Sequence, residues 1–337
     1  MPGEPVRAGL IGFGSMGKVI LRALRSIPAV EAIAVCDPDR SRWDETGGTA
    51  RYFGDHRSLL ADFQPDLVCI ATLPCLHRPM LEAAASAGAR WILCEKPIAT
   101  SVRDARAMID LCEARGVALG VNHGKRSNPR YAELKRHHLA AIGDVRSITY
   151  VCGGGRLGCV GTHIYDLVRY LFDTEIVWVN GAIDSVYVAD HKGRPDAYDP
   201  GGHSIAMCEN GSRILLDVCE DMGISGFLTL NGSLGRIVVD EVNDTWTRYR
   251  RREADRERRL GEYDLPLQAE EIRLPFFDLQ DLTERMISSV LAGRPDCTGS
   301  DGLKSIEPVL STHLSHQIGR RVELPIANHV EISIDFS

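Results

Sequence analysis

A short glycine-rich segment near the start of the sequence has the spacing of a phosphate-binding turn. Its residues follow the pattern G-x-G-x-x-G between an apolar run and an amphipathic segment. They are Gly12, Phe13, Gly14, Ser15, Met16 and Gly17. In such a turn the first glycine allows the tight bend, the second lets a pyrophosphate approach the backbone, and the third lets helix and strand pack closely. Because the start of a helix presents free N–H groups, these six residues predict a dinucleotide-binding site.

An acidic residue at the end of the next apolar run strengthens this prediction. Asp37 follows Gly17 by about 20 residues, the spacing at which a carboxylate binds the ribose hydroxyls of NAD. Its negative charge would repel the 2′-phosphate of NADP, so we expect NAD as the cofactor. Arg40 and Arg42 follow closely and could bind that phosphate instead, which leaves NADP as the alternative.

Alternating strands and helices must hold this turn in place. In the first third of the chain, apolar runs alternate with segments in which apolar residues recur at helical spacing. We expect strands at residues 6–11, 30–36, 67–71, 91–94 and 117–121, and helices at 16–27, 77–87 and 101–115. This alternation implies right-handed crossovers and a mostly parallel sheet. Residues 1–124 are therefore predicted to form a Rossmann domain that binds NAD(P).

The pattern changes after residue 122. Strand-like segments at 145–151, 204–208, 212–219, 227–230 and 236–239 follow one another, often with no helix between them. Two Asn-Gly segments, at 209–212 and 231–233, have the composition of hairpin turns. Helices are expected at 161–172 and 278–291. Residues 125–337 are therefore predicted to form an α+β domain for substrate binding and oligomerisation, with a large, mainly antiparallel sheet.

The sequence Cys-Glu-Lys-Pro at residues 94–97 resembles the most specific signature of the glucose–fructose oxidoreductase, inositol dehydrogenase and MocA (Gfo/Idh/MocA) family. Ile-Ala-Thr-Leu-Pro at 70–74 and Gly-x-His-x-x-Asp at 161–166 are similar to segments of that family in the same order. The resemblance implies hydride transfer between a nicotinamide and a hydroxyl-bearing carbon of a sugar or polyol. It also implies which residues border the cofactor. They are Thr72, His77, Glu95 and Lys96.

The same resemblance assigns the catalytic groups. Lys96 lies beside the substrate hydroxyl, where an ammonium can stabilise a developing alkoxide. His163 takes the hydroxyl proton, a task that suits imidazole because its ordinary pKa of about 6.5 is close to working pH. Asp166 follows one helical turn later and either orients His163, binds a substrate hydroxyl or is structural. Arg126, Cys159 and His203 are further candidates for contact with the substrate, which would be polyhydroxylated or acidic.

One position departs from the family pattern. Many members carry an Asp four residues before the catalytic histidine, where this chain has Cys159. A neutral thiol cannot supply the negative charge of a carboxylate, and we favour a packing role for Cys159 over a reactive one. The substitution leaves two other functions open. One is an enzyme that holds NAD tightly and uses it transiently for elimination or glycoside cleavage without net oxidation; the other is an NAD-binding regulatory protein without catalysis.

Composition disfavours several other classes of protein. The net charge of −7 argues against a nucleic-acid partner, and the mixed-charge run at 248–259 is interpreted as a solvated face or loop. The sequence contains neither a long apolar run typical of a membrane span nor the spacing of metal ligands. Ten scattered cysteines without a C-x-x-C pair fit a reducing cytoplasm. We therefore expect a cytoplasmic protein without a metal. We also expect a homodimer or homotetramer, because a large sheet needs its open face covered.

Overall fold

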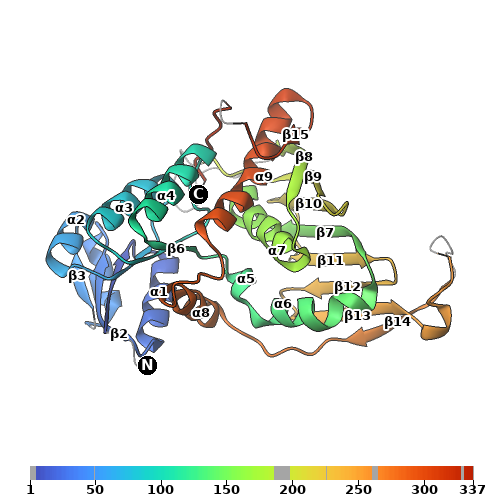
Figure 1. The fold of residues 1–337 in the computed structure, drawn as a ribbon, viewed down its shortest axis with the longest axis horizontal. Helices are drawn as coiled ribbons and strands as arrows, with labels where there is room; N and C mark the ends of the chain where they lie inside the picture. Colours follow the sequence, from blue (N-terminus) through green and yellow to red (C-terminus); the bar gives the residue numbers. More distant parts are fainter. Residues whose placement is uncertain are drawn as a thin grey trace. The chain divides into compact units, whose positions relative to one another are not determined.

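The computed structural model describes residues 5–48, 50–185, 198–224, 226–259, 265–327 and 330–336. The chain divides into two compact units, which are described one at a time (Figure 1). Unit 1 comprises residues 1–128, 277–306 and 331–337, and unit 2 comprises residues 129–276 and 307–330. No helix among the described residues is both long enough and apolar enough to cross a bilayer.

Unit 1 is built around a six-stranded parallel sheet in the order β3-β2-β1-β4-β5-β6. Its strands are β1 (Val6–Ile11), β2 (Val30–Cys36), β3 (Arg51–Phe53), β4 (Leu67–Ile70), β5 (Trp91–Cys94) and β6 (Ala118–Val121). Its helical segments are α1 (Ser15–Ser26), η1 (Arg40–Thr46), α2 (His56–Ser58), η2 (Leu59–Phe63), α3 (Pro74–Ser86), α4 (Val102–Arg115), α5 (Gly124–Ser127) and α8 (Leu279–Leu291). All four residues of β4 are buried, as expected for a strand covered on both faces. The predicted Rossmann fold is confirmed.

Helix α8 returns to unit 1 from a distant part of the sequence. It begins at a capping box, in which the Asp278 side chain accepts the Asp281 N–H and the Asp281 side chain accepts the Asp278 N–H. In α1, Arg22 Nε donates to Gln280 Oε1 at 3.2 Å. Gly120 of β6 lies so close to α8 that a Cβ would be 2.4 Å from Val290. These contacts group residues 277–306 with unit 1, although the change of pattern after residue 122 predicts them in the second domain.

Unit 2 contains a nine-stranded sheet in the order β14-β13-β12-β11-β7-β10-β9-β8-β15. Its strands are β7 (Val145–Gly153), β8 (Ile176–Ile183), β9 (Gly202–Cys208), β10 (Arg213–Cys219), β11 (Phe227–Gly232), β12 (Gly235–Asp240), β13 (Thr245–Arg251), β14 (Leu267–Glu271) and β15 (Val322–Glu323). The pairing of β7 with β10 is parallel and the other described pairings are antiparallel. The predicted mainly antiparallel sheet is confirmed.

Among the described residues, unit 2 also contains six helical segments within its own residue ranges. They are α6 (Pro129–Glu133), η3 (Leu134–His138), η4 (Leu139–Ile142), η5 (Leu157–Gly161), α7 (Thr162–Phe172) and η7 (Glu253–Asp255). Helix α9 (Gly299–Ile318) begins in unit 1 and ends in unit 2. Strands β8, β13, β14 and β15 and helix α9 are not among the elements predicted from the sequence. The mixed-charge run therefore begins within strand β13, since residues 248–250 pair with both β12 and β14.

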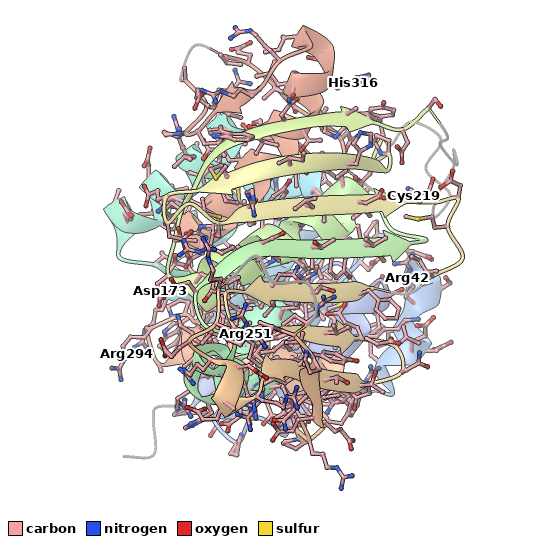
Figure 2. All side chains as sticks on the ribbon, turned by 90° about the vertical axis from the view of Figure 1, so that its right-hand side faces the viewer. Arg42, Asp173, Cys219, Arg251, Arg294 and His316 are labelled. Atoms are coloured by element: carbon pink, nitrogen blue, oxygen red, sulfur yellow. The ribbon has the colours of Figure 1, made fainter. Side chains whose placement is uncertain are left out.

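The two faces of the large sheet differ. In β10, Ile214, Leu216 and Val218 are buried and the residues between them are exposed. Helix α7 lies on the buried face, because the Tyr165 hydroxyl is hydrogen-bonded to Ser204 Oγ of β9 at 2.6 Å. Figure 2 shows the strands of this sheet running across the view. Leu215 and Asp217, whose side chains alternate with the buried ones of β10, are exposed. The opposite face of the sheet is therefore left open by the helices of unit 2.

Candidate functional site

The glycine turn between β1 and α1 has two tight positions and one open position. Gly12 has a φ of +95°, and a Cβ there would lie 2.5 Å from the Ala71 carbonyl oxygen. A Cβ on Gly17 would lie 2.3 Å from the Gly12 carbonyl oxygen. By contrast, a Cβ on Gly14 would approach only the end of Arg42, at 3.8 Å. The first and third glycines are thus required by packing within the protein, whereas the second faces open space.

The start of α1 lies beside this open space. Gly14 is the N-cap residue, and no described side chain caps the helix there. The first N–H groups of an α-helix have no partner within the helix. Ser15, Met16 and Gly17 therefore present backbone donors at the positive end of the helix dipole, next to a backbone that a bound group can approach closely.

Asp37, directly after β2, is hydrogen-bonded to the same turn. Its side chain is buried, and Oδ2 accepts the Phe13 N–H at 2.7 Å while Oδ1 accepts the Asp39 N–H at 2.9 Å. Arg42 Nη1 lies 3.3 Å from Asp37 Oδ2, and Arg42 Nε lies 3.2 Å from Asp39 Oδ2. The carboxylate is thus fixed at the turn, and the guanidinium beside it is already paired with two acidic residues.

His77 joins two loops at the carboxyl end of the parallel sheet. It is fully buried in α3, and its Nδ1 lies 3.0 Å from the Pro97 carbonyl oxygen and 3.2 Å from that of Ile98. Its Nε2 lies 3.2 Å from the Thr72 carbonyl oxygen. Burial lowers the pKa of His77, although the three carbonyls favour the charged ring. Both ring nitrogens are used to connect the Thr72 loop to the loop that carries Lys96.

Glu95 and Lys96 directly follow β5. Glu95 is buried, and its Oε1 accepts a hydrogen bond from Asn122 Nδ2 at 2.6 Å, while Oε2 accepts the Lys96 N–H at 3.3 Å. Burial raises the pKa of Glu95, and the bond from Asn122 offsets part of this rise. Lys96 itself is half-buried. Sequence reasoning missed Asn122, whose only signal is its place directly after β6, at the edge of a parallel sheet where ligands bind.

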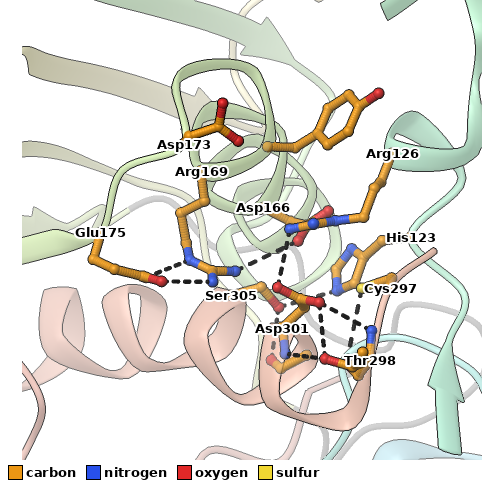
Figure 3. A network of polar contacts seen from close by, with 12 residues as sticks. His123, Arg126, Asp166, Arg169, Asp173, Glu175, Cys297, Thr298, Asp301 and Ser305 are labelled. Carbon is orange, nitrogen blue, oxygen red and sulfur yellow. Dashed lines mark hydrogen bonds and ion pairs between the residues drawn. The ribbon is translucent and has the colours of Figure 1, made fainter. Parts of the chain in front are cut away.

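Arg126, in α5, is held by the start of α9 (Figure 3). Its Nη2 lies 3.3 Å from Asp301 Oδ1. The other oxygen of Asp301 accepts hydrogen bonds from the Thr298 N–H at 3.0 Å and from the Thr298 hydroxyl at 2.8 Å. Nearby, Ser305 Oγ donates to the Gly302 carbonyl at 2.7 Å and lies 3.0 Å from His123 Nε2. Arg126 is thus only slightly exposed, and Asp301 is a partner that the sequence did not reveal.

In unit 2, helix α7 carries His163 and Asp166 one turn apart. Asp166 is fully buried, and its Oδ1 lies 3.7 Å from Arg169 Nη1. Arg169 also donates from Nε to Glu175 Oε2 at 2.7 Å and from Nη2 to Glu175 Oε1 at 3.1 Å, a network visible in Figure 3. A buried carboxylate needs such compensation. Asp166 is thereby fixed on α7, and His163 is half-buried at the start of the helix.

The helical turn η5 directly precedes α7 and contains Cys159. The Gly158 N–H donates to Asp199 Oδ1 at 2.7 Å, and the Cys159 N–H donates to Asp199 Oδ2 at 3.1 Å. Asp199 itself is fully buried. Sequence reasoning missed Asp199, because it lies about 40 residues from η5 in the chain and belongs to no motif.

His203 lies on the other face of the large sheet from His163. Ser204 points toward α7, since its Oγ contacts Tyr165, and successive side chains of a strand alternate between faces. His203 accordingly is exposed on the open face, opposite Asp217 of β10. The structure therefore does not bring His203 to the side of the sheet that carries α7. Among the described residues, no three His, Cys, Asp or Glu side chains gather as metal ligands.

Comparisons with known proteins agree with this geometry. The sequence profile of a family described as "Oxidoreductase family, NAD-binding Rossmann fold" matches residues 6–123. D-apiose dehydrogenase of Paraburkholderia graminis is 29% identical over 94% of this chain and 89% of that protein. Inositol 2-dehydrogenase of Acidothermus cellulolyticus is 31% identical over 70% of this chain and 70% of that protein. The solved structure of levoglucosan dehydrogenase with NADH and levoglucosan shares the fold, with a TM-score of 0.79, 22% identity and coverage of 96% of this chain and 100% of that one.

Proposed function

The chain belongs to the Gfo/Idh/MocA family of NAD-binding oxidoreductases, and we propose from this membership that it is a dehydrogenase acting on a hydroxyl-bearing carbon of a sugar, a polyol or a related hydroxy compound. The observation that carries the proposal is the turn at Gly14. Space for a ligand, an uncapped helix start and the carboxylate of Asp37 meet there. The names of the two relatives support the substrate class.

The residues of unit 1 fit NAD, which supplies the hydride acceptor at C4 of its nicotinamide when bound. We propose that the N–H groups at the start of α1 bind its pyrophosphate and that Asp37 accepts bonds from its ribose hydroxyls. Thr72, Glu95 and Lys96 border the cofactor, and His77 holds two of their loops together. The buried charge of Asp37 favours NAD over NADP, because Arg42 is paired with Asp37 and Asp39 rather than free for a 2′-phosphate.

The two proposed catalytic groups have different roles: one stabilises charge and the other accepts a proton. The Lys96 ammonium stabilises the negative charge that develops on the substrate oxygen, and the His163 imidazole takes the hydroxyl proton. Arg126 and Asp166 remain proposed substrate contacts, held in place by Asp301 and Arg169. His203 is not part of this proposal, because it faces away from α7.

A spectrophotometric screen tests the function. The protein is mixed with NAD+ or NADP+ and with D-apiose, levoglucosan, inositols, aldoses and sugar acids, and absorbance at the reduced-nicotinamide band is followed. We expect reduction of NAD+ with at least one of these compounds and a slower reaction with NADP+. Copurified cofactor with turnover but no net NADH would instead support the elimination or glycoside-cleavage alternative. Binding of NADH without any turnover would support the regulatory alternative.

The open face of the large sheet supports self-association. Ile205, Leu215 and Phe227 are 48%, 38% and 37% exposed although they lie in strands. Large exposed apolar patches mark interaction sites, and two copies of the same face can cover each other in a symmetric dimer. We propose a homodimer or homotetramer formed through this face. We also propose a cytoplasmic location, because the ten cysteines are scattered through the sequence without a C-x-x-C pair.

A charge on this face should break the assembly. We expect light scattering coupled to gel filtration to give a mass of two or four chains for the native protein and a lower mass for Ile205→Glu, because a carboxylate buried in an apolar interface is strongly destabilising. Val242→Glu, at a turn residue that is 72% exposed, is the matched control and should keep the native mass. A native protein that elutes as a monomer at micromolar concentration would contradict the proposal.

A further inference from the structure

The carboxylate that this chain lacks at position 159 is present beside that position in space. Asp199 comes from the segment before β9, and its two oxygens bind the N–H groups of Gly158 and Cys159 at 2.7 Å and 3.1 Å. The Leu157 N–H donates to the adjacent Pro200 carbonyl at 3.1 Å, so the segment is docked along the whole start of η5. A carboxylate thus lies next to the backbone of residue 159.

His163 lies roughly one helical turn beyond Cys159, and the chain runs without interruption from η5 into α7. Residues four apart share a face of a helix, and helical side chains tilt toward the N-terminal end. The His163 side chain therefore leans back over the turn to which Asp199 is bound. An Asp at position 159 would lie on the same face of the helix as His163 and would approach its imidazole from the N-terminal side.

The two N–H contacts do not by themselves require a charge. An Asn caps a helix start about as well as an Asp. A fully buried carboxylate, in contrast, costs free energy unless its negative charge is compensated. An imidazole that takes up a proton during the reaction becomes a positive charge, which a nearby buried carboxylate stabilises.

We propose that Asp199 is the positioning residue of His163 and replaces the carboxylate that the family carries at position 159. The inference rests on the proposed role of His163 as the base. The proton of the substrate hydroxyl passes to the imidazole, and Asp199 stays ionised and balances the imidazolium. No further reactant is needed.

Other charged groups around η5 and α7 are paired and stay unchanged in the test. Arg156 donates from Nε to Glu220 Oε1 at 2.7 Å, and Asp166 is paired with Arg169. Next to Asp199 in the chain, the Tyr198 ring contacts the His313 ring, and burial lowers the pKa of His313 to about 4. A change in the titration of His163 on replacement of Asp199 alone is thus attributable to Asp199.

The test is the titration of His163 in the protein without substrate, observed by NMR with 13Cε1-labelled histidine. The chain has 11 histidines, so the His163 signal is identified by its absence in His163→Gln. A nearby carboxylate favours the imidazolium, so Asp199→Asn should lower the pKa of His163 by roughly one unit. Adding Cys159→Asp to Asp199→Asn should restore most of that shift. Asp240→Asn, which removes another buried carboxylate that accepts backbone N–H groups in unit 2, should leave the signal unchanged.

Two results would overturn the inference. One is an unchanged His163 titration in a folded Asp199→Asn protein. The other is a shift that Cys159→Asp does not reverse and that accompanies a lower melting temperature, which would make Asp199 a helix cap only. The proposed function is judged separately, by whether His163→Gln loses turnover in the substrate found by the screen, because the titration is read without any turnover.

Discussion

Lys96→Met is expected to fold and bind NADH normally while kcat falls on the order of 10²–10³-fold or more, because the methionine keeps the length of the side chain but removes the charge that stabilises the developing alkoxide. The fold should tolerate the change. The bond from residue 96 to Glu95 is made by the backbone N–H, which the variant retains. The measurement is kcat with the substrate found by the screen, together with NADH binding followed by fluorescence.

Lys135→Met is the matched control. Lys135 Nζ donates to the Tyr170 carbonyl at 2.6 Å and to Asp173 Oδ1 at 2.6 Å, so the variant removes a paired lysine from unit 2. Its kcat should equal that of the native protein, with a loss of stability of at most about 1 kcal/mol. Normal kcat in Lys96→Met would remove Lys96 from the mechanism.

Gly14→Ala is expected to lose NADH affinity by at least roughly tenfold, or ~1.4 kcal/mol, without a change in melting temperature. The added methyl meets only Arg42 within the protein, at 3.8 Å, but it fills the space through which a pyrophosphate would approach the backbone. Titration of NADH and thermal unfolding without cofactor measure the two effects independently.

Gly17→Ala serves as the contrast to this variant. Its methyl would lie 2.3 Å from the Gly12 carbonyl oxygen, so helix and strand must move apart. Overpacking of this kind costs about 1–3 kcal/mol of stability, and the melting temperature should fall. If Gly14→Ala bound NADH as tightly as the native protein, the open space at Gly14 would not be the cofactor site.

Local sequence was sufficient to predict the glycine turn and the acidic residue that follows the second strand. The spacing from Gly12 to Gly17 and on to Asp37 is set within one strand–helix–strand unit, and the structure places the Asp37 carboxylate on the Phe13 N–H of that turn. Five of the six strands of unit 1 were also predicted, because buried parallel strands are short apolar runs. The three-residue strand β3 was not predicted. Helix α9 was missed, since Gly299, Gly302 and Pro308 resemble breaks in a helix. The two glycines are instead needed for contact with β6, where their Cβ atoms would lie 2.8 Å from Leu119 and 2.7 Å from Val121.

The face of His203 shows why pattern alone failed in unit 2. Ile205 shares that face with His203 and is 48% exposed, whereas the polar Ser204 on the opposite face is buried. What covers a sheet face is not encoded in the strand itself.

What the sequence determined by itself is therefore everything that depends on neighbours in the chain: the glycine turn, Asp37, Lys96 directly after β5 and the helix that carries His163. Tertiary structure alone decided which side chains from distant segments meet, such as Asn122 with Glu95, Asp301 with Arg126 and Asp199 with Cys159. The physical reason is that periodicity and propensity act over one or two turns or strands, whereas these contacts form only when packing of the whole core brings together segments separated by tens of residues or more.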